Sequence, residues 1–312
     1  MLILALSVST LTAGANWHNW AIQPSTFYQS SLAPVSPPLY SVYMPVVFKP
    51  NPPCTSDGLI AFTSTELPQY EISLVCSDGS ARRLVTYSPG FESTSPTWSP
   101  DKTRFAFMST IEGIRGIYIY DLSCNCVTGK IPVDLDAYTP AWSPDGQRMA
   151  FYAPDGIYVV NIDGSGLIHV TDNGGGPSWS PDGTRIAYSA SQDGRSVIRI
   201  TEVGGTGFTQ FPTTPGIDWS LAWSPDGTRI AFASNQGFTV NLYLINVDGT
   251  GLMQLTDMSS YEYFPSWSPD GQQLAFQAYV YSTRQTDIYV VNANGTGLKL
   301  ITSQGAEPAW TH

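Results

Sequence analysis

Carboxylates recur shortly before a repeated tryptophan along most of this chain. Each of six tryptophans has at least one Asp or Glu within the seven residues before it, often beside an aromatic residue. The candidate binding residues are Glu92, Asp136, Tyr138, Asp172, Asp218, Trp219, Glu262, Tyr263 and Glu307. If the fold gathers these segments, they would focus a negative potential that attracts a basic peptide segment or a cation, and the aromatic rings would provide contact area. The alternative is that acids and prolines precede these strands only for solubility.

A second array of carboxylates follows the tryptophans at a fixed distance. It comprises Asp101, Asp145, Asp182, Asp226 and Asp270, and the first four are each followed three residues later by Arg104, Arg148, Arg185 and Arg229. An Asp in a tight turn accepts hydrogen bonds from its own backbone, and the arginine offers a local partner. We therefore interpret this array as architectural.

The sequence offers little for acid–base or nucleophilic catalysis. Its three histidines, His18, His169 and His312, are far apart, and a catalytic nucleophile needs an adjacent base. We find no Gly-x-Ser-x-Gly elbow, no phosphate-binding Gly-x-x-x-x-Gly-Lys and no His-Glu-x-x-His motif. The sequence therefore predicts a protein that is not an enzyme and that binds no metal or cofactor.

Four cysteines allow three disulfide pairings. In an extended strand the Cα atoms of Cys124 and Cys126 would lie roughly 6.7 Å apart, near the outer limit for a disulfide. These two residues could form a strained bridge or pair separately with Cys54 and Cys76. We prefer Cys54–Cys76 and Cys124–Cys126.

The elements that must position these residues form a repeat. The motif Pro-x-Trp-Ser-Pro-Asp-Gly occurs in five near-complete copies and in a sixth, truncated copy at the end of the chain. Its tryptophans are Trp98, Trp142, Trp179, Trp223, Trp267 and Trp310, spaced by 44, 37, 44, 44 and 43 residues. A period of roughly 40–45 residues is typical of a four-stranded β-propeller blade.

Each copy predicts four strands. The tryptophan segment forms a short inner strand that ends in the Ser-Pro-Asp-Gly turn, and three strands follow, as in Arg229–Phe232, Leu242–Ile245 and Leu252–Thr256. A repeat without its Trp strand precedes the first motif, and a Trp strand without its repeat ends the chain. We therefore predict an all-β, six-bladed β-propeller of four-stranded antiparallel blades, whose ring is closed by the C-terminal Trp strand completing the N-terminal blade.

The repeat resembles a known family. Trp-Ser-Pro-Asp-Gly followed by Arg-Ile-Ala-Phe is similar to the repeat of TolB-like propellers, also called WD40-like or PD40 repeats, between Gly58 and His312. The resemblance implies the propeller fold, which serves periplasmic TolB-like proteins, non-catalytic domains of some serine peptidases and stand-alone exported proteins. Because one fold serves several functions, the resemblance alone does not give the function, which must be inferred from a binding or catalytic site. TolB-like proteins also carry an N-terminal α/β domain, whose place is taken here by a Pro-rich segment.

Composition and the first residues indicate export. The excess of 25 Asp+Glu over 14 Lys+Arg gives a net charge of -11, which argues against a nucleic-acid partner.

Residues 1–15 resemble a secretory signal and are too short for a membrane span, with an N-terminal strand as the alternative. Residues 16–53 predict a linker or stalk, unless Tyr43–Phe48 forms an outer strand. Residues 54–312 form the propeller, expected to be a monomer in the periplasm, at the cell surface or outside the cell.

The sequence favours a non-catalytic exported binding protein that holds a protein or peptide partner at an acidic, aromatic mouth of the propeller. A carbohydrate-binding module is the alternative, because aromatic rings flanked by carboxylates also suit sugars. The salt dependence of binding distinguishes the two hypotheses, because binding of a peptide through charge weakens steeply as salt is added. A propeller enzyme such as a lyase is the third hypothesis, and it would be expected to cluster several histidines around a metal.

Overall fold

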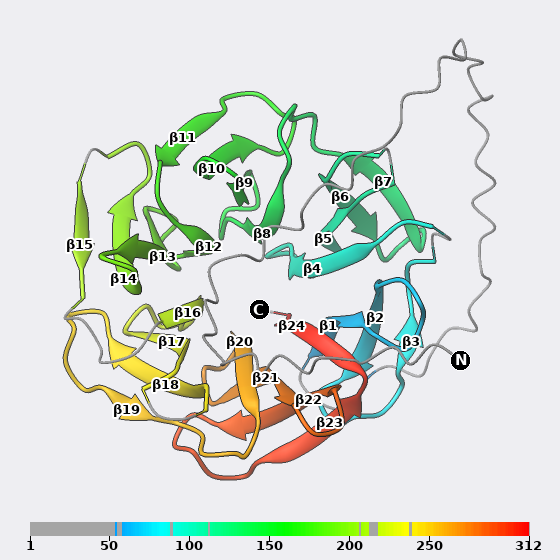
Figure 1. Cartoon of the computed structure of the whole chain (residues 1–312). Helices are drawn as coiled ribbons and strands as arrows, with labels where there is room; N and C mark the ends of the chain where they lie inside the picture. The colour runs from blue at the N-terminus through cyan, green and yellow to red at the C-terminus, as the bar shows by residue number, and fades with distance from the viewer. Residues whose placement is uncertain are drawn as a thin grey trace, which may run out of the picture. The chain divides into compact units, whose positions relative to one another are not determined.

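The chain folds into a six-bladed β-propeller, as predicted (Figure 1). The structure is a computed structural model that describes residues 54, 58–87, 90–111, 113–205, 207–211, 218–236 and 239–311. In this part of the chain, twenty-four strands form six four-stranded antiparallel sheets arranged in a ring. None of the described residues forms a helix able to cross a membrane. The expectations for residues 1–53 lie outside the described residues.

Each blade runs from an inner to an outer strand. The first blade contains β24 (Gly305–Trp310), β1 (Leu59–Ser64), β2 (Glu71–Cys76) and β3 (Arg83–Leu84). The second contains β4 (Ser93–Trp98), β5 (Arg104–Ser109), β6 (Gly116–Asp121) and β7 (Cys126–Lys130), and the third contains β8 (Tyr138–Trp142), β9 (Arg148–Ala153), β10 (Gly156–Asn161) and β11 (Ile168–Thr171). The fourth contains β12 (Gly175–Trp179), β13 (Arg185–Gln192), β14 (Arg195–Glu202) and β15 (Phe208–Gln210). The fifth contains β16 (Asp218–Trp223), β17 (Arg229–Ser234), β18 (Asn241–Asn246) and β19 (Met253–Gln254), and the sixth contains β20 (Tyr261–Trp267), β21 (Gln273–Val280), β22 (Gln285–Asn292) and β23 (Lys299–Ser303).

The C-terminal strand closes the ring. β24 pairs antiparallel with β1, with Trp310 opposite Ile60. Thr311 extends the pairing, because its backbone N–H donates to the carbonyl of Leu59 at 2.9 Å and its hydroxyl accepts the Leu59 N–H at 3.2 Å. The predicted closure is therefore confirmed, and the two ends of the propeller sequence share one sheet.

The repeat tryptophans are buried at the blade interfaces. All six are at most 7% exposed. The core between the second and third blades shows the arrangement, since Trp142 packs there with Ile117 and Ile119 of β6 and with Met149 and Phe151 of β9. Burying so large a ring removes much apolar surface from water, so the tryptophans join neighbouring blades.

Two kinds of contact alternate around the ring, because the residue before each tryptophan alternates between a hydroxyl residue and alanine. These residues are Thr97, Ala141, Ser178, Ala222, Ser266 and Ala309. Each alanine carbonyl accepts a hydrogen bond from the indole N–H of the next blade's tryptophan. Trp179 donates to Ala141 (3.0 Å), Trp267 to Ala222 (3.1 Å) and Trp98 to Ala309 (3.0 Å). Each hydroxyl accepts a hydrogen bond from the backbone N–H of the next blade's tryptophan. Trp142 donates to Thr97 (3.4 Å), Trp223 to Ser178 (3.0 Å) and Trp310 to Ser266 (2.9 Å).

The Ser-Pro-Asp-Gly turns satisfy their own polar groups. In the fourth blade the carboxylate of Asp182 accepts hydrogen bonds from the Ser180 hydroxyl at 2.5 Å and from the Thr184 N–H at 3.0 Å. These bonds lower the pKa of Asp182 to about 2. Arg185 lies 3.8 Å from this carboxylate, and its guanidinium carbon lies 5.0 Å from the ring centre of Trp223 in the next blade. These contacts support the architectural interpretation of the array.

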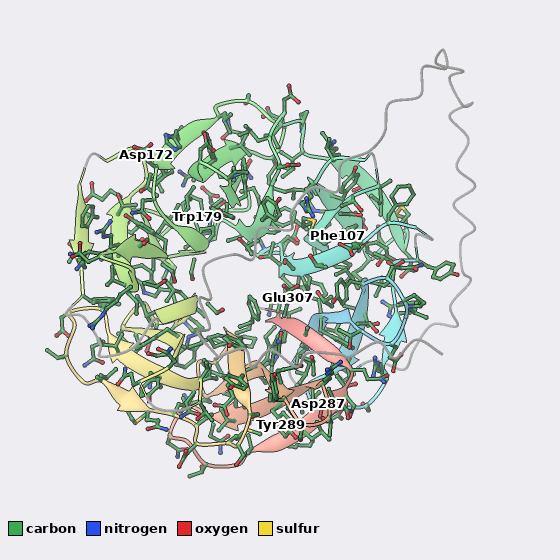
Figure 2. All side chains as sticks on the ribbon, viewed as in Figure 1. Phe107, Asp172, Trp179, Asp287, Tyr289 and Glu307 are labelled. Carbon is green, nitrogen blue, oxygen red and sulfur yellow. A yellow bond between two sulfur atoms is a disulfide. The ribbon has the colours of Figure 1, made fainter. Side chains whose placement is uncertain are left out.

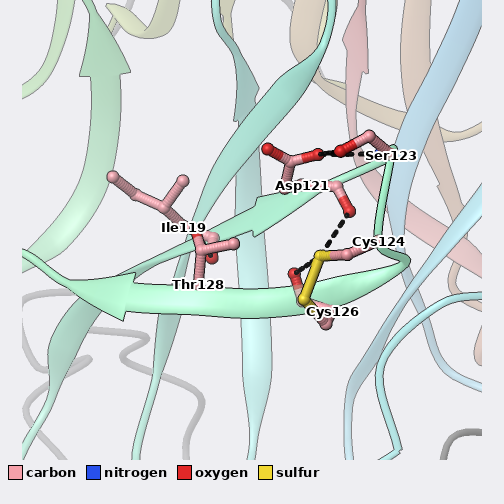
Figure 3. Close-up of a disulfide and its surroundings, with 6 residues drawn as sticks. All are labelled: Ile119, Asp121, Ser123, Cys124, Cys126 and Thr128. Atoms are coloured by element: carbon pink, nitrogen blue, oxygen red, sulfur yellow. Dashed lines mark hydrogen bonds between the residues drawn. A yellow bond between two sulfur atoms is a disulfide. The ribbon is translucent and has the colours of Figure 1, made fainter.

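Two disulfides join Cys54 to Cys76 and Cys124 to Cys126, in the pairing preferred above. The second closes the turn between β6 and β7 (Figure 3). Its Cα atoms lie 5.3 Å apart, closer than in an extended strand, because the chain turns at Asn125 with a φ of 51°. Disulfides persist in oxidising compartments such as the periplasm.

Candidate functional site

Each inner strand contains a β-bulge, and one residue in each bulge has a left-handed backbone. The residue three positions before the tryptophan has a positive φ in every blade: Ser95 (54°), Thr139 (42°), Gly176 (61°), Ser220 (50°), Phe264 (54°) and Glu307 (50°). The pairing of every inner strand shifts register at this point. We call these six residues the bulge ring.

The bulge ring lines a central channel. The cavity has a volume of about 920 Å³ and includes all six ring residues. Five of the six are not glycine, and for these a positive φ costs about 1–2 kcal/mol. Bulges re-aim side chains, and strained backbone is enriched at binding sites. The ring is therefore the leading candidate site on this propeller.

The channel wall is mostly uncharged. Among the described lining residues, hydroxyls and prolines predominate, and the two charged side chains are Glu307 and Asp172. The Glu307 carboxylate accepts hydrogen bonds from the Ser95 N–H at 2.8 Å and from the Thr63 hydroxyl at 2.8 Å. Its Oε2 also accepts the Ser95 hydroxyl at 3.2 Å. Glu307 thus joins the first and second blades while it lines the channel.

The cavity extends outward between the third and fourth blades. We call this part, lined by Tyr152, Asp172–Gly176, Ser189 and Ser191, the glycine arm. The Asp172 side chain is 93% exposed and lies 3.4 Å from Nδ1 of His169. Figure 2 shows Glu307 beside the middle of the ring and Asp172 farther out, near the end of β11.

Comparison with known proteins identifies the family of this propeller. The family described as TolB beta propeller domain matches residues 59–212 and 176–312, which together cover most of the chain. The chain belongs to this family. A 34-residue segment is 53% identical to a protein named Protein TolB homolog from Protochlamydia amoebophila, covering 11% of this chain and 7% of that one.

Solved TolB structures share the fold. TolB from Acinetobacter baumannii superposes with a TM-score of 0.70 at 24% identity, over 81% of this chain and 66% of that one. A putative TolB from Agrobacterium tumefaciens gives 0.65 at 22% identity, over 80% and 90% of the two chains. An oligogalacturonate lyase in complex with manganese gives 0.52 at 15% identity, over 78% and 73%. The chain spans a small part of the curated TolB homolog and just under two thirds of the Acinetobacter protein.

The TolB-type propeller does not gather all nine predicted acidic and aromatic residues in one place. Asp172 and Glu307 line the cavity, whereas Glu92 and Asp136 are exposed outside it. Tyr138 packs against Tyr152 with the rings tilted by 44° and 5.8 Å between their centres, and it lies under the guanidinium of Arg115. Tyr263 is half-buried beside Phe264. Asp218 and Trp219 begin β16, and their side chains lie outside the described part of the structure.

The prediction that Glu262 lies at the mouth of the propeller is wrong. Its side chain is fully buried, so it cannot contact a ligand there. The carboxylate accepts hydrogen bonds from the hydroxyls of Thr256 and Ser260, and burial raises its pKa to about 7. Glu71, from another blade, is also fully buried and accepts the Thr86 hydroxyl at 2.6 Å. The count of acids before each Trp missed this, because alternate residues of a strand point in opposite directions.

Sequence reasoning missed the bulge ring apart from Glu307. Ser95, Thr139, Ser220 and Phe264 carry no charge and are not all of one residue type, so only their common position three residues before the tryptophan relates them. It also missed the pair formed by His169 and Asp172, which are three residues apart. Among the described residues, no three His, Cys, Asp or Glu side chains lie close enough to hold a metal ion.

Proposed function

We propose that this protein is an exported, non-catalytic binding protein that holds a segment of a protein partner in the channel of its propeller. The bulge ring carries the proposal, because six left-handed positions, one from each blade, line one cavity with residues of five types: Ser (twice), Thr, Gly, Phe and Glu. A site for one asymmetric partner needs such differences, whereas a purely structural ring would repeat one residue.

Two further observations support the proposal. Membership of the TolB propeller family favours a protein partner in the periplasm. The two disulfides favour an oxidising compartment. The channel volume of about 920 Å³ is at the upper end of the range for small-molecule sites, and it is large enough for several residues of a peptide.

A channel-filling variant tests the proposal. In the double variant S95F/S220F, two ring residues take the side chain that Phe264 already carries at the same φ, so the fold should tolerate both. We expect the immobilised propeller to retain a partner from the exported proteins of the cells that produce it, and we expect S95F/S220F to lose at least nine tenths of that binding. Leu298→Ala, at an exposed position 48% accessible to solvent, is the matched control.

Equal retention by the parent and S95F/S220F would contradict the proposal. Retention of glycans that does not respond to salt would instead favour the carbohydrate-binding alternative, because the channel residues Ser95 and Ser220 carry hydroxyls, which also suit sugars.

A further inference from the structure

The glycine arm departs from the pattern of the other blades. At the ring position the five other blades carry Ser, Thr, Ser, Phe and Glu, and the fourth blade carries Gly176. A Cβ built on Gly176 would meet no atom within 4 Å, and one on Gly175 would meet Tyr152 at an ordinary 3.7 Å. Gly174 differs, because its Cβ would lie 2.4 Å from the ring of Tyr188. Packing thus requires Gly174, whereas neighbouring atoms leave room for a side chain at Gly175 and, at the cost of a positive φ, at Gly176.

The absence of side chains at Gly175 and Gly176 leaves space. The cavity reaches through this space from the channel to Asp172. The floor of the arm is held in shape by Asn173, whose side-chain amide donates to the Ser191 carbonyl at 2.8 Å and accepts the Ser191 N–H at 3.0 Å. The arm is therefore an ordered, open extension of the channel.

The polar groups of the arm indicate what it would bind. Asp172 is the more accessible of the two lining carboxylates, since it is 93% exposed with His169 at 3.4 Å, whereas Glu307 already accepts three hydrogen bonds within the protein. No Lys or Arg is among the described residues that line the cavity. Ser189 Oγ, in the wall of the arm, is buried and has no hydrogen-bond partner in the described protein. Negative charge without a lining cation favours a cationic ligand, and the unpaired hydroxyl favours one with polar backbone groups.

We propose that the glycine arm holds an extended stretch of the partner peptide, and that a Lys or Arg of that stretch pairs with Asp172. This inference rests on the proposed function, because it assigns a path and a charge to the peptide in the channel. The peptide backbone lies over Gly175 and Gly176, where a side chain would block it. Tyr152 contacts the peptide between the channel and Asp172.

Nuclear magnetic resonance of the labelled propeller tests the inference with two probes. The first is an acetylated and amidated octapeptide of Ala and Ser with one central Arg, and the second carries citrulline, which has nearly the same shape without the charge. We expect the arginine peptide to shift the amide signals of Gly175 and Gly176. We expect its affinity to exceed that of the citrulline peptide about threefold to fivefold, as for a solvent-exposed ion pair.

Variants locate the effect. Asp172→Asn should remove the preference for arginine, and Gly176→Phe should abolish the shifts in the arm while it copies the residue and φ of Phe264. Glu92→Gln, an exposed acid outside the cavity, is the matched control and should change neither. Equal thermal midpoints for the variants would show that each remains folded.

The outcomes separate this inference from the proposed function. Shifts at Ser95, Ser220 and Phe264 with none in the arm, and no effect of Asp172→Asn, would overturn the inference and leave the channel as a peptide site. Arm shifts that the citrulline peptide reproduces at equal affinity would overturn the pairing with Asp172. Binding of a neutral oligosaccharide in the arm, without response to the peptides, would overturn both.

Discussion

The two ends of each inner strand follow different rules. At the end that follows the tryptophan, the Ser-Pro-Asp turn recurs with the same internal hydrogen bonds, as those to Asp101, Asp145 and Asp182 show. At the end before the tryptophan, every blade keeps the positive φ, but the residue varies among Ser, Thr, Gly, Phe and Glu. The first end makes blades alike, and the second makes them different. A repeat protein can thus keep its fold in one part of the unit and vary its binding surface in another.

The largest expected effect comes from alanine substitutions on the two sides of the boundary between the variable and the conserved end of an inner strand. Trp267 is fully buried between blades, and Phe264, three residues earlier, lines the channel. We expect Trp267→Ala to lower the free energy of unfolding by about 3–5 kcal/mol, as for a large core residue. Phe264→Ala should lower it by no more than about 1 kcal/mol. Urea unfolding measures both, and similar losses for the two variants would remove the distinction between the ends.

The second effect concerns Glu262, the buried carboxyl before the tryptophan. Its pKa is about 7 in the folded state, against 4.5 for an ordinary glutamate. Between these pH values the folded state binds more protons than the unfolded state, so the free energy of unfolding falls as the pH rises from 4.5 to about 7. We expect a fall of about 2–3 kcal/mol, and Glu262→Gln should flatten it. An unchanged pH profile in Glu262→Gln, with Glu92→Gln as the control, would contradict the assignment.

A smaller effect separates a strained from an unstrained position on the inner strands, Thr139 on β8 and Thr97 on β4. Thr139 has a φ of 42°, and its buried hydroxyl has no hydrogen-bond partner in the described protein. Thr139→Gly should therefore relieve strain and raise the free energy of unfolding by about 1 kcal/mol. Thr97 accepts the Trp142 N–H, so Thr97→Gly should be destabilising by about 1 kcal/mol. Thermal unfolding checks the pair, and a loss in both variants would show that the ring is unstrained.

The smallest effect tests the turn end. The pKa of Asp182 is lowered chiefly by the Ser180 hydroxyl, so Ser180→Ala should raise it towards the ordinary value of 3.8. Asp182 contributes stability above that value and loses it as the pH falls towards about 2, opposite to Glu262. Carbon-detected titration of the Asp182 carboxyl measures the change. A pKa that stays near 2 in Ser180→Ala would contradict this assignment and show that the Thr184 hydrogen bonds and Arg185 hold the pKa down without the Ser180 hydroxyl.

The sequence was sufficient to predict the blades, because their spacing, turns and tryptophans are local patterns. Even ring closure followed from an incomplete first repeat and a last Trp310 without a repeat. The site was harder to predict. Which acid faces the channel depends on the bulge, which reverses the direction of successive side chains, so Glu307 lines the cavity and Glu262 is buried. The glycine arm depends on neighbouring blades, since Tyr152 and Gly175 meet only in the folded ring.

Site-specific photo-crosslinking from the bulge ring tests the central claim that the channel holds a partner. Benzoylphenylalanine replaces Ser220, because another blade already carries an aromatic side chain, Phe264, at the same position of the bulge ring. In a control variant it replaces the exposed Leu298. After irradiation with the exported proteins of the producing cells, we expect one peptide segment of one partner to be joined to position 220, and none to position 298. Crosslinks of equal yield from both positions, or from position 298 alone, would contradict the account.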